Sequence, residues 1–220
     1  MKRIAYYGGT FDPVHLGHLT IARRLISVFE LDEFVLLPAF HAPHKPDSKP
    51  TSGYHRHAML CLATEEDPDI RVSRLELESG ERRYTIDTLS RLKELHAGDK
   101  LFFVMGADSW ADILTWRSWE EVLLAVSHIV VSRPGYAIST DHVSDAVRRR
   151  IADVRGETPG DVAAASRSRG EDRIYFTDAV NFDVSATEIR DDIRADEVLD
   201  RTDAVPDAVA KYIEKYELYR

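Results

Sequence analysis

The residues that could carry chemistry begin directly after the first apolar run of the chain, where two glycines precede two histidines. Gly8 and Gly9 follow the β-prone run at residues 3–7, and His15 and His18 come shortly after them. Adjacent glycines let the backbone turn tightly and approach a ligand closely. A helix that begins near His15 would point its free N–H groups and positive dipole end into this loop, which favours an anion. The two imidazoles share one helix face and could donate hydrogen bonds to phosphate oxygens.

Other interpretations of the histidine pair stay open on spacing alone. One histidine could cap the helix while the other packs into the core. A zinc site built on the pair would need further ligands, which are not evident. The loop does not match the GxxxxGK[ST] pattern of a P-loop or the GxGxxG spacing of a dinucleotide site.

A second group of polar residues lies far along the chain. Ser185 or Thr187 can cap the start of a helix and leave its amides free for phosphate oxygens. Arg190 adds a permanent planar cation with several N–H donors. Taken alone, this spacing is more often an ordinary capped helix.

Apolar periodicity predicts the elements that position these residues. The predicted strands are 3–7, 34–37, 70–72, 101–105, 128–131 and 174–176, and the predicted helices are 16–29, 54–66, 84–96, 119–125, 141–153 and 204–216. The small and polar stretch 156–172 is expected to be a mobile surface loop.

Buried strands that alternate with helices indicate βαβ units and a mostly parallel sheet that is covered on both faces. Ligands of such sheets bind beyond the carboxyl ends of the strands. We therefore expect the chemistry in the loops after Tyr7, Leu37, Met105, Val131 and Phe176.

Composition narrows the class of protein. The 220 residues are 44% hydrophobic and 30% charged, as in ordinary globular chains, and the single cysteine, Cys61, excludes an internal disulfide. The net charge of −9 disfavours a nucleic-acid partner but does not exclude small phosphorylated ligands. Every apolar run is far shorter than the roughly 20 residues of a membrane span, and no signal peptide is visible. We expect a cytoplasmic protein without a membrane partner.

The two polar groups together resemble the signatures of the nucleotidylyltransferase superfamily. His15-Leu16-Gly17-His18 matches its HxGH motif, and residues 184–190 correspond to ISxTxxR with Val184 in place of isoleucine. From Lys2 to about Arg194 the chain is most similar to the bacterial nicotinate-nucleotide adenylyltransferases. The further matching elements are GGTFDPVHLGH, PHK at 43–45, YTxDTL at 84–89, GAD at 106–108 with Trp116, and SRPGY at 132–136.

The resemblance implies a fold and a reaction. The fold would be an α/β, single-domain, Rossmann-like doubly wound parallel sheet with helices on both faces, spanning 1–220 with a C-terminal helical portion from about 185 to 220. The reaction would transfer the adenylyl group of ATP to nicotinate mononucleotide, giving deamido-NAD and pyrophosphate. The phosphate of the mononucleotide would attack in line.

The resemblance also implies roles for individual residues. The catalytic group would be His15, His18, Lys45 and Arg190. ATP would contact Gly8, Gly9, Thr10, Phe11, His15, His18, Gly106, Asp108, Arg133, Ser185, Thr187 and Arg190. The mononucleotide would contact Gly9, Thr10, Lys45, Thr85, Asp108 and Trp116, with Trp116 stacked on the pyridine ring and Thr85 near its carboxylate. Mg²⁺ would be held mainly by phosphates and water, so no metal ligand is assigned to the chain.

Alternative functions stay open at this point. The acceptor could be nicotinamide mononucleotide or another phosphorylated compound such as phosphopantetheine, or the chain could be a nucleotide-binding regulator without catalysis. ATP and nicotinate mononucleotide are the expected small-molecule partners, and a homodimer is left open.

Overall fold

A parallel sheet forms the centre of the computed structural model, which describes residues 1–40, 50–78, 83–133, 135–136, 138–167, 172–180, 185–195 and 204–220. Its strands are β1 (Arg3–Gly9), β2 (Glu33–Pro38), β3 (Ile70–Val72), β4 (Lys100–Gly106), β5 (Ser127–Val131), β6 (Ile151–Asp153) and β7 (Ile174–Thr177). Within the described residues the seven strands follow the order β3-β2-β1-β4-β5-β7-β6, and each neighbouring pair is parallel.

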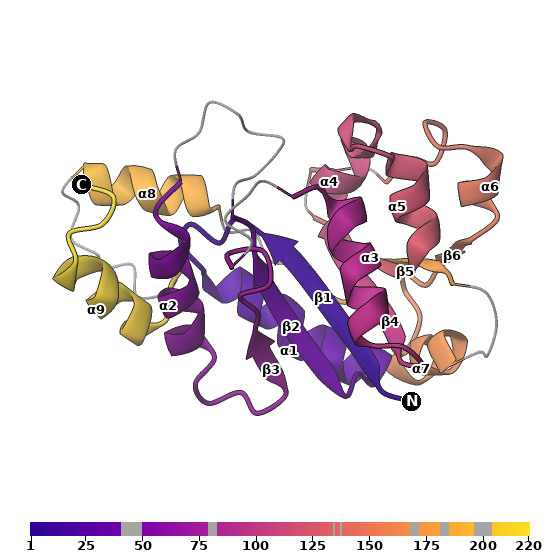
Figure 1. Cartoon of the computed structure of the whole chain (residues 1–220), viewed down its shortest axis with the longest axis horizontal. Helices are drawn as coiled ribbons and strands as arrows, with labels where there is room; N and C mark the ends of the chain where they lie inside the picture. Colours follow the sequence, from indigo (N-terminus) through magenta and orange to yellow (C-terminus); the bar gives the residue numbers. More distant parts are fainter. Residues whose placement is uncertain are drawn as a thin grey trace.

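Helices cover both faces of this sheet (Figure 1). They are α1 (Leu16–Phe29), α2 (Gly53–Ala63), α3 (Thr85–Leu95), α4 (Ala107–Ala111), the short 3-10 helix η1 (Ile113–Thr115), α5 (Trp119–Ala125), α6 (Asp145–Arg148), α7 (Pro159–Arg167), α8 (Ala186–Arg194) and α9 (Asp207–Lys215). One buried cluster joins α1, α2, α7, α8 and α9 to one face, and a second joins α3, α4, α5 and α6 to the other. The predicted doubly wound α/β fold is confirmed.

Strand β4 shows why its sequence lacks polar alternation. Phe102 and Val104 belong to the cluster under α1, whereas Phe103 and Met105 belong to the cluster under α3. Because both faces of the strand are buried, every position favours an apolar side chain. The described residues contain no helix that is long and apolar enough to cross a membrane.

The helix predicted over 141–153 was wrong. Only Asp145–Arg148 is helical, and Ile151–Asp153 forms the edge strand β6. Its backbone pairs with β7, which begins where the Ile174 amide donates to the carbonyl oxygen of Arg150. Pairing with a distant strand therefore determined the structure of this segment, and local periodicity could not show that.

The surface loop predicted over 156–172 was also wrong. Pro159–Arg167 forms α7, which packs against α1 and buries Val162, Ala163 and Ser166. The Arg3 guanidinium also donates to the Ser166 side chain and carbonyl oxygen, at 2.7 and 3.1 Å. The alanines that made this stretch look featureless are strong helix formers. Residues 168–171 lie outside the described residues.

The winding of the sheet reverses at β1, which pairs with β2 on one side and with β4 on the other. Strands that follow β1 in the chain extend the sheet to β3, and later strands extend it from β4 in the opposite direction. Open α/β sheets bind ligands in the crevice beyond such a switch point. The carboxyl ends of β1 and β4, at Gly9 and Gly106, therefore mark the place for a site.

Candidate active site

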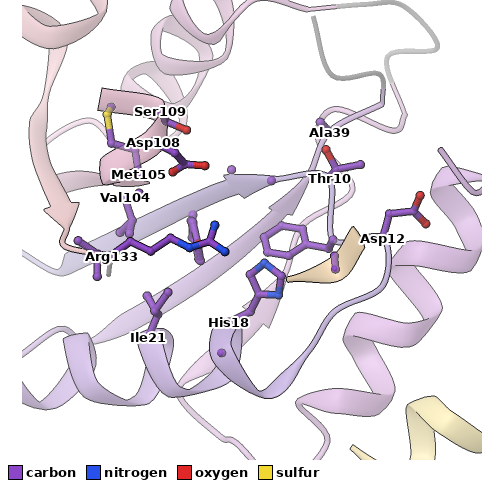
Figure 2. Close-up of a pocket in the computed structure, with 18 of the residues that line it drawn as sticks. Thr10, Asp12, His18, Ile21, Ala39, Val104, Met105, Asp108, Ser109 and Arg133 are labelled. Atoms are coloured by element: carbon purple, nitrogen blue, oxygen red, sulfur yellow. The ribbon is translucent and has the colours of Figure 1, made fainter. Parts of the chain in front are cut away.

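A pocket of about 930 Å³ lies at this switch point, and Figure 2 shows part of its lining. The ends of β1, β4 and β5 form its floor, and the first turns of α1 and α8 contribute to its wall. It contains the described residues that the sequence predicts for the site: Gly8, Gly9, Thr10, Phe11, His15, His18, Thr85, Gly106, Asp108, Trp116, Arg133, Ser185, Thr187 and Arg190. Lys45 lies outside the described residues.

The two histidines lie against each other at the start of α1. His15 occupies the N-cap position in an extended conformation, and its ring centroid lies 3.7 Å from that of His18. The backbone N–H of His15 donates to Nδ1 of His18 at 3.3 Å. The edge-to-face ring of Phe11 lies 4.9 Å from the His18 ring. The predicted helix start and shared face are confirmed.

Burial keeps both imidazoles neutral near pH 7. It lowers the pKa of His15 to about 4, with a smaller contribution from the charge of Arg133. Burial also lowers the pKa of His18 well below its usual value, followed by the effects of His15 and Arg133. Within the described residues, the buried Nδ1 of His15 has no hydrogen-bond partner. A neutral imidazole still donates one N–H, so the pair can bind a phosphate oxygen without carrying a charge.

Gly9 keeps the end of β1 open. A Cβ atom at this position would lie 2.9 Å from the ring of Phe11, which is closer than real Cβ contacts. Phe11 itself has a φ of 50°, so the chain turns sharply directly after the strand. A side chain at Gly9 would therefore displace the Phe11 ring, which packs against His18.

Arg56 is a buried residue that the sequence reasoning missed. Its guanidinium, fully shielded from solvent, donates to the carbonyl oxygens of Thr10, Ala39 and Thr51 at 2.6, 2.7 and 2.8 Å. It therefore joins the loop after β1 to the end of β2 and the start of α2. A signal was present, because Arg56 shares the spacing of the buried face of α2 with Met59, Leu60 and Ala63.

The second polar group is positioned by the first turn of α8. The Ser185 hydroxyl accepts a hydrogen bond from the Thr187 amide at 3.3 Å, so the predicted cap is confirmed. The Arg190 guanidinium donates to the Thr187 hydroxyl at 3.1 Å and to the carbonyl oxygen of Asp12 at 2.6 Å. Arg190 thus ties α8 to the loop after β1, which are far apart in the sequence.

Aromatic and polar groups form another part of the pocket wall. Thr85 begins α3, and Trp116 ends η1 with its ring edge-to-face on Phe103 at 6.5 Å. Glu76 lies in the same lining, where burial raises its pKa and the Thr88 hydroxyl donates to it at 2.8 Å. The Glu76 carboxyl was not predicted from the sequence.

Two further charged residues of the lining follow the strands β4 and β5. Asp108 follows β4 at the start of α4, and Arg133 follows β5. Figure 2 shows the Arg133 guanidinium and the His18 ring directed toward the same space, with Asp108 nearby. Trp110 has a structural role, because it is buried and its indole N–H donates to the Ser139 carbonyl at 2.8 Å.

Metal ligands are not clustered in the part of the chain that the structure describes. No group of three or more His, Cys, Asp or Glu side chains lies close enough there to hold an ion. The His15–His18 pair therefore has no third ligand of these types among the described residues. Cations, backbone amides and neutral imidazole N–H groups are the features that this pocket presents to an anionic ligand.

Comparison with known proteins assigns the family. The family model described as cytidylyltransferase-like matches residues 6–192. A probable nicotinate-nucleotide adenylyltransferase of Mycolicibacterium vanbaalenii is 35% identical, and the match covers 100% of this chain and 92% of the relative. A probable nicotinate-nucleotide adenylyltransferase of Citrifermentans bemidjiense is 37% identical over 99% of this chain and 98% of the relative. The chain belongs to the nicotinate-nucleotide adenylyltransferase family.

A solved structure shows that the family fold also extends over the whole chain. The Plasmodium falciparum nicotinic acid mononucleotide adenylyltransferase complexed with NaAD has a TM-score of 0.73 at 22% identity. That likeness covers 100% of this chain and 98% of the Plasmodium chain. The nicotinate-nucleotide adenylyltransferase match therefore includes the C-terminal residues beyond Arg194, where the motif resemblance ended.

Replacement of Arg56 by lysine should destabilise the protein. One ammonium group cannot reach three separate carbonyl oxygens, and buried acceptors without partners cost about 1–3 kcal/mol each. We expect the free energy of unfolding of Arg56→Lys, measured by urea denaturation, to fall by about 3 kcal/mol or more. Arg74→Lys is the matched control, because Arg74 forms an exposed ion pair with Glu78. Equal stability of Arg56→Lys and the wild type would contradict this role.

Acid should destabilise the fold through its buried histidines. Burial lowers the pKa of His15 and of His128, a core residue of β5, to about 4 from an ordinary 6.5. The unfolded state therefore binds more protons than the folded state between these values, so stability falls as pH drops from 6.5 toward 4. Unfolding curves across this range should show a shallower decline for His128→Gln than for the wild type. An unchanged slope would argue against a neutral buried His128.

Proposed function

We propose that this chain transfers the adenylyl group of ATP to nicotinate mononucleotide and releases pyrophosphate. The observation that most supports this proposal is that two helices begin at one pocket, α1 at the His15–His18 pair and α8 at Ser185. Arg190 connects α8 to the loop before α1. Helix N-termini favour anions through their free N–H groups and dipoles. A polyphosphate chain matches this arrangement, and the family assignment supports the same reaction.

The attacking group needs no strong base. A phosphate monoester has its second pKa near 6, so the mononucleotide phosphate is already largely ionised at neutral pH. One of its oxygens forms a bond to the α-phosphorus of ATP while the bond from that phosphorus to the bridging oxygen breaks. Pyrophosphate leaves with the electron pair of that bond. Positioning and charge stabilisation therefore supply the catalysis.

His15 and His18 donate N–H groups to the ATP phosphates as charge moves onto the leaving oxygens. They act as neutral donors because burial has lowered the pKa of both. Ser185, Thr187 and the α8 amides hold the β- and γ-phosphates, with the guanidinium of Arg190 beside them. Lys45, whose structure is not described, supplies a further cation to these phosphates.

The remaining polar groups orient the two nucleotides. Asp108 accepts from a ribose hydroxyl or an amide, and Arg133 lies on the adenine side. Gly8, Gly9 and Gly106 let backbone approach the ligand. Mg²⁺ would enter as part of the ATP substrate and would screen the pyrophosphate charge. Its ligands would be mainly phosphate and water oxygens.

Selectivity for the acid arises at the start of α3. Thr85 and the neighbouring amides donate to the pyridine carboxylate, and Trp116 stacks on the ring. A site built from donors leaves a nicotinamide group poorly matched, because its NH₂ brings a further donor. The mononucleotide of nicotinate is therefore the preferred acceptor.

Pyrophosphate release with ATP and Mg²⁺ tests this function directly. We expect turnover with nicotinate mononucleotide at an efficiency about tenfold or more above that with nicotinamide mononucleotide. Equal efficiencies would keep the enzyme class but reject the account of Thr85. Release with neither acceptor, from protein that binds ATP, would favour a nucleotide-binding regulator or another phosphorylated acceptor.

Replacement of His18 by alanine should lower kcat/KM for ATP by about 100-fold, the usual cost of one oxyanion donor. The ratio of kcat/KM for the wild type to kcat/KM for His18→Ala should stay constant between about pH 6.5 and about pH 8.5, because the free enzyme uses a neutral imidazole. Taking the ratio cancels the titration of ATP itself.

A requirement for a protonated His18 would give a different pH dependence. A histidine that must be protonated would give a ratio that falls toward one as pH rises, by up to tenfold per pH unit above its pKa. That result would reject the neutral-donor role of His18. Binding of ATP by His18→Ala, measured by calorimetry, shows that the variant keeps its pocket.

A further inference from the structure

Tyr219, near the C-terminal end of this sequence, contacts the loop that follows β1. After α9 the backbone turns. The Glu217 amide donates to the carbonyl oxygen of Glu214 at 3.2 Å, and the Leu218 amide donates to the carbonyl oxygen of Ile213 at 3.1 Å. Tyr219 then has a left-handed φ of 70° and packs against the core cluster under α1. Figure 1 shows the C terminus near α8, on the side of the molecule that holds α2 and α9.

This turn brings the hydroxyl of Tyr219 to Asp12. It donates to Asp12 Oδ1 at 2.7 Å, and the backbone N–H of Thr51 donates to Oδ2 at 3.1 Å. The carbonyl oxygen of Asp12 accepts from Arg190 at 2.6 Å. Asp12 is only 7% exposed, so these groups replace water around its carboxylate. The three partners hold both the side chain and the backbone of one loop residue.

The phenol stays a donor across the working pH range. Burial raises the pKa of Tyr219, and the neighbouring Asp12 raises it further. A protonated hydroxyl against a carboxylate forms a short, charge-assisted hydrogen bond, about twice as strong as a neutral one. The contact is therefore strong enough to fix a loop and is not merely a surface contact.

Asp12 is part of the pocket lining, but Figure 2 shows its carboxylate turned away from His18. Thr10 and His18 come from the loop and the helix on either side of it in the sequence. Fixing Asp12 therefore fixes the path of the chain from Gly9 to His15. That path sets the positions of the β1 end and of the N-cap of α1.

We propose that Tyr219 is a positioning residue, which holds residues 10–15 in their ATP-binding geometry through Asp12. The inference rests on the proposed function for the identity of the ligand. It assigns to the C-terminal end of the chain a part in ATP binding that the predicted motifs do not contain. Arg56 also holds this loop, because its guanidinium donates to the carbonyl oxygen of Thr10.

The experiment compares Tyr219→Phe with Tyr216→Phe. The first variant removes only the hydroxyl, which contacts the carboxylate of Asp12 and also the side chain of Thr51. The second removes a hydroxyl from a neighbouring, half-exposed tyrosine that packs on Tyr212 and His55. For each we would measure the Kd for ATP with Mg²⁺ by calorimetry, KM for ATP and for nicotinate mononucleotide, kcat, and the denaturation midpoint.

For Tyr219→Phe we expect Kd and KM for ATP to rise about tenfold, the loss that corresponds to one hydrogen bond to a charged group. KM for the mononucleotide should stay within about twofold of the wild-type value, and Tyr216→Phe should match the wild type. A lower kcat with both KM values unchanged would indicate a loss of folded enzyme and would overturn the proposal. Unchanged ATP binding would overturn it as well.

A double-mutant cycle checks the route of the effect. Adding Tyr219→Phe to Asp12→Ala should weaken ATP binding no further, because the alanine variant has already removed the carboxylate through which the hydroxyl acts. Additive losses would overturn the proposed route. The ATP Kd needs no acceptor, so the role of Tyr219 is decided even if neither mononucleotide is a substrate. In that case the proposed function would be rejected, and the ATP Kd would still decide the role of Tyr219.

Discussion

The arrangement of the site depends on a buried guanidinium that satisfies backbone carbonyls at the ends of two adjacent strands. Loops that leave β1 and β2 toward a ligand cannot pair their carbonyl oxygens in the sheet, and buried acceptors without partners are costly. Arg56 binds three of them, at Thr10, Ala39 and Thr51, from within α2. The same group fills space in the core and holds the loop that carries Asp12. Stability and site geometry therefore share one interaction.

An acidic chain binds a polyanion here by local means. The net charge is −9, yet the pocket contains helix starts, Arg133 and Arg190, and imidazoles that burial keeps uncharged. Neutral donors and amides favour phosphate oxygens at short range without a long-range positive field. Such a site can select a nucleotide by shape and hydrogen bonding although the chain as a whole is acidic.

The sequence was informative where structure is local or repeated in a motif. The bounds of α1 were predicted exactly as Leu16–Phe29, and the strand-end loops led to the pocket. Prediction failed where contacts with residues far along the chain determine the secondary structure. Strand β6 forms because it pairs with β7, and α7 forms because it packs against α1. The partners of Arg56 and Tyr219 also lie on other elements, so the sequence could not show what these side chains bind. The spacing of Arg56 indicated only that it lies on the buried face of α2.

The contact between Asp12 and Tyr219 joins positions 207 residues apart. Chains are synthesised from the N-terminus, so the residues around Asp12 leave the ribosome well before Tyr219 does. The segment that holds the two histidines is therefore made early and lacks this contact until Tyr219 has emerged. A nascent chain that has not reached Tyr219 can already contain the strands β1 to β7. Formation of the sheet and support of the loop after β1 are thus separated in time during synthesis.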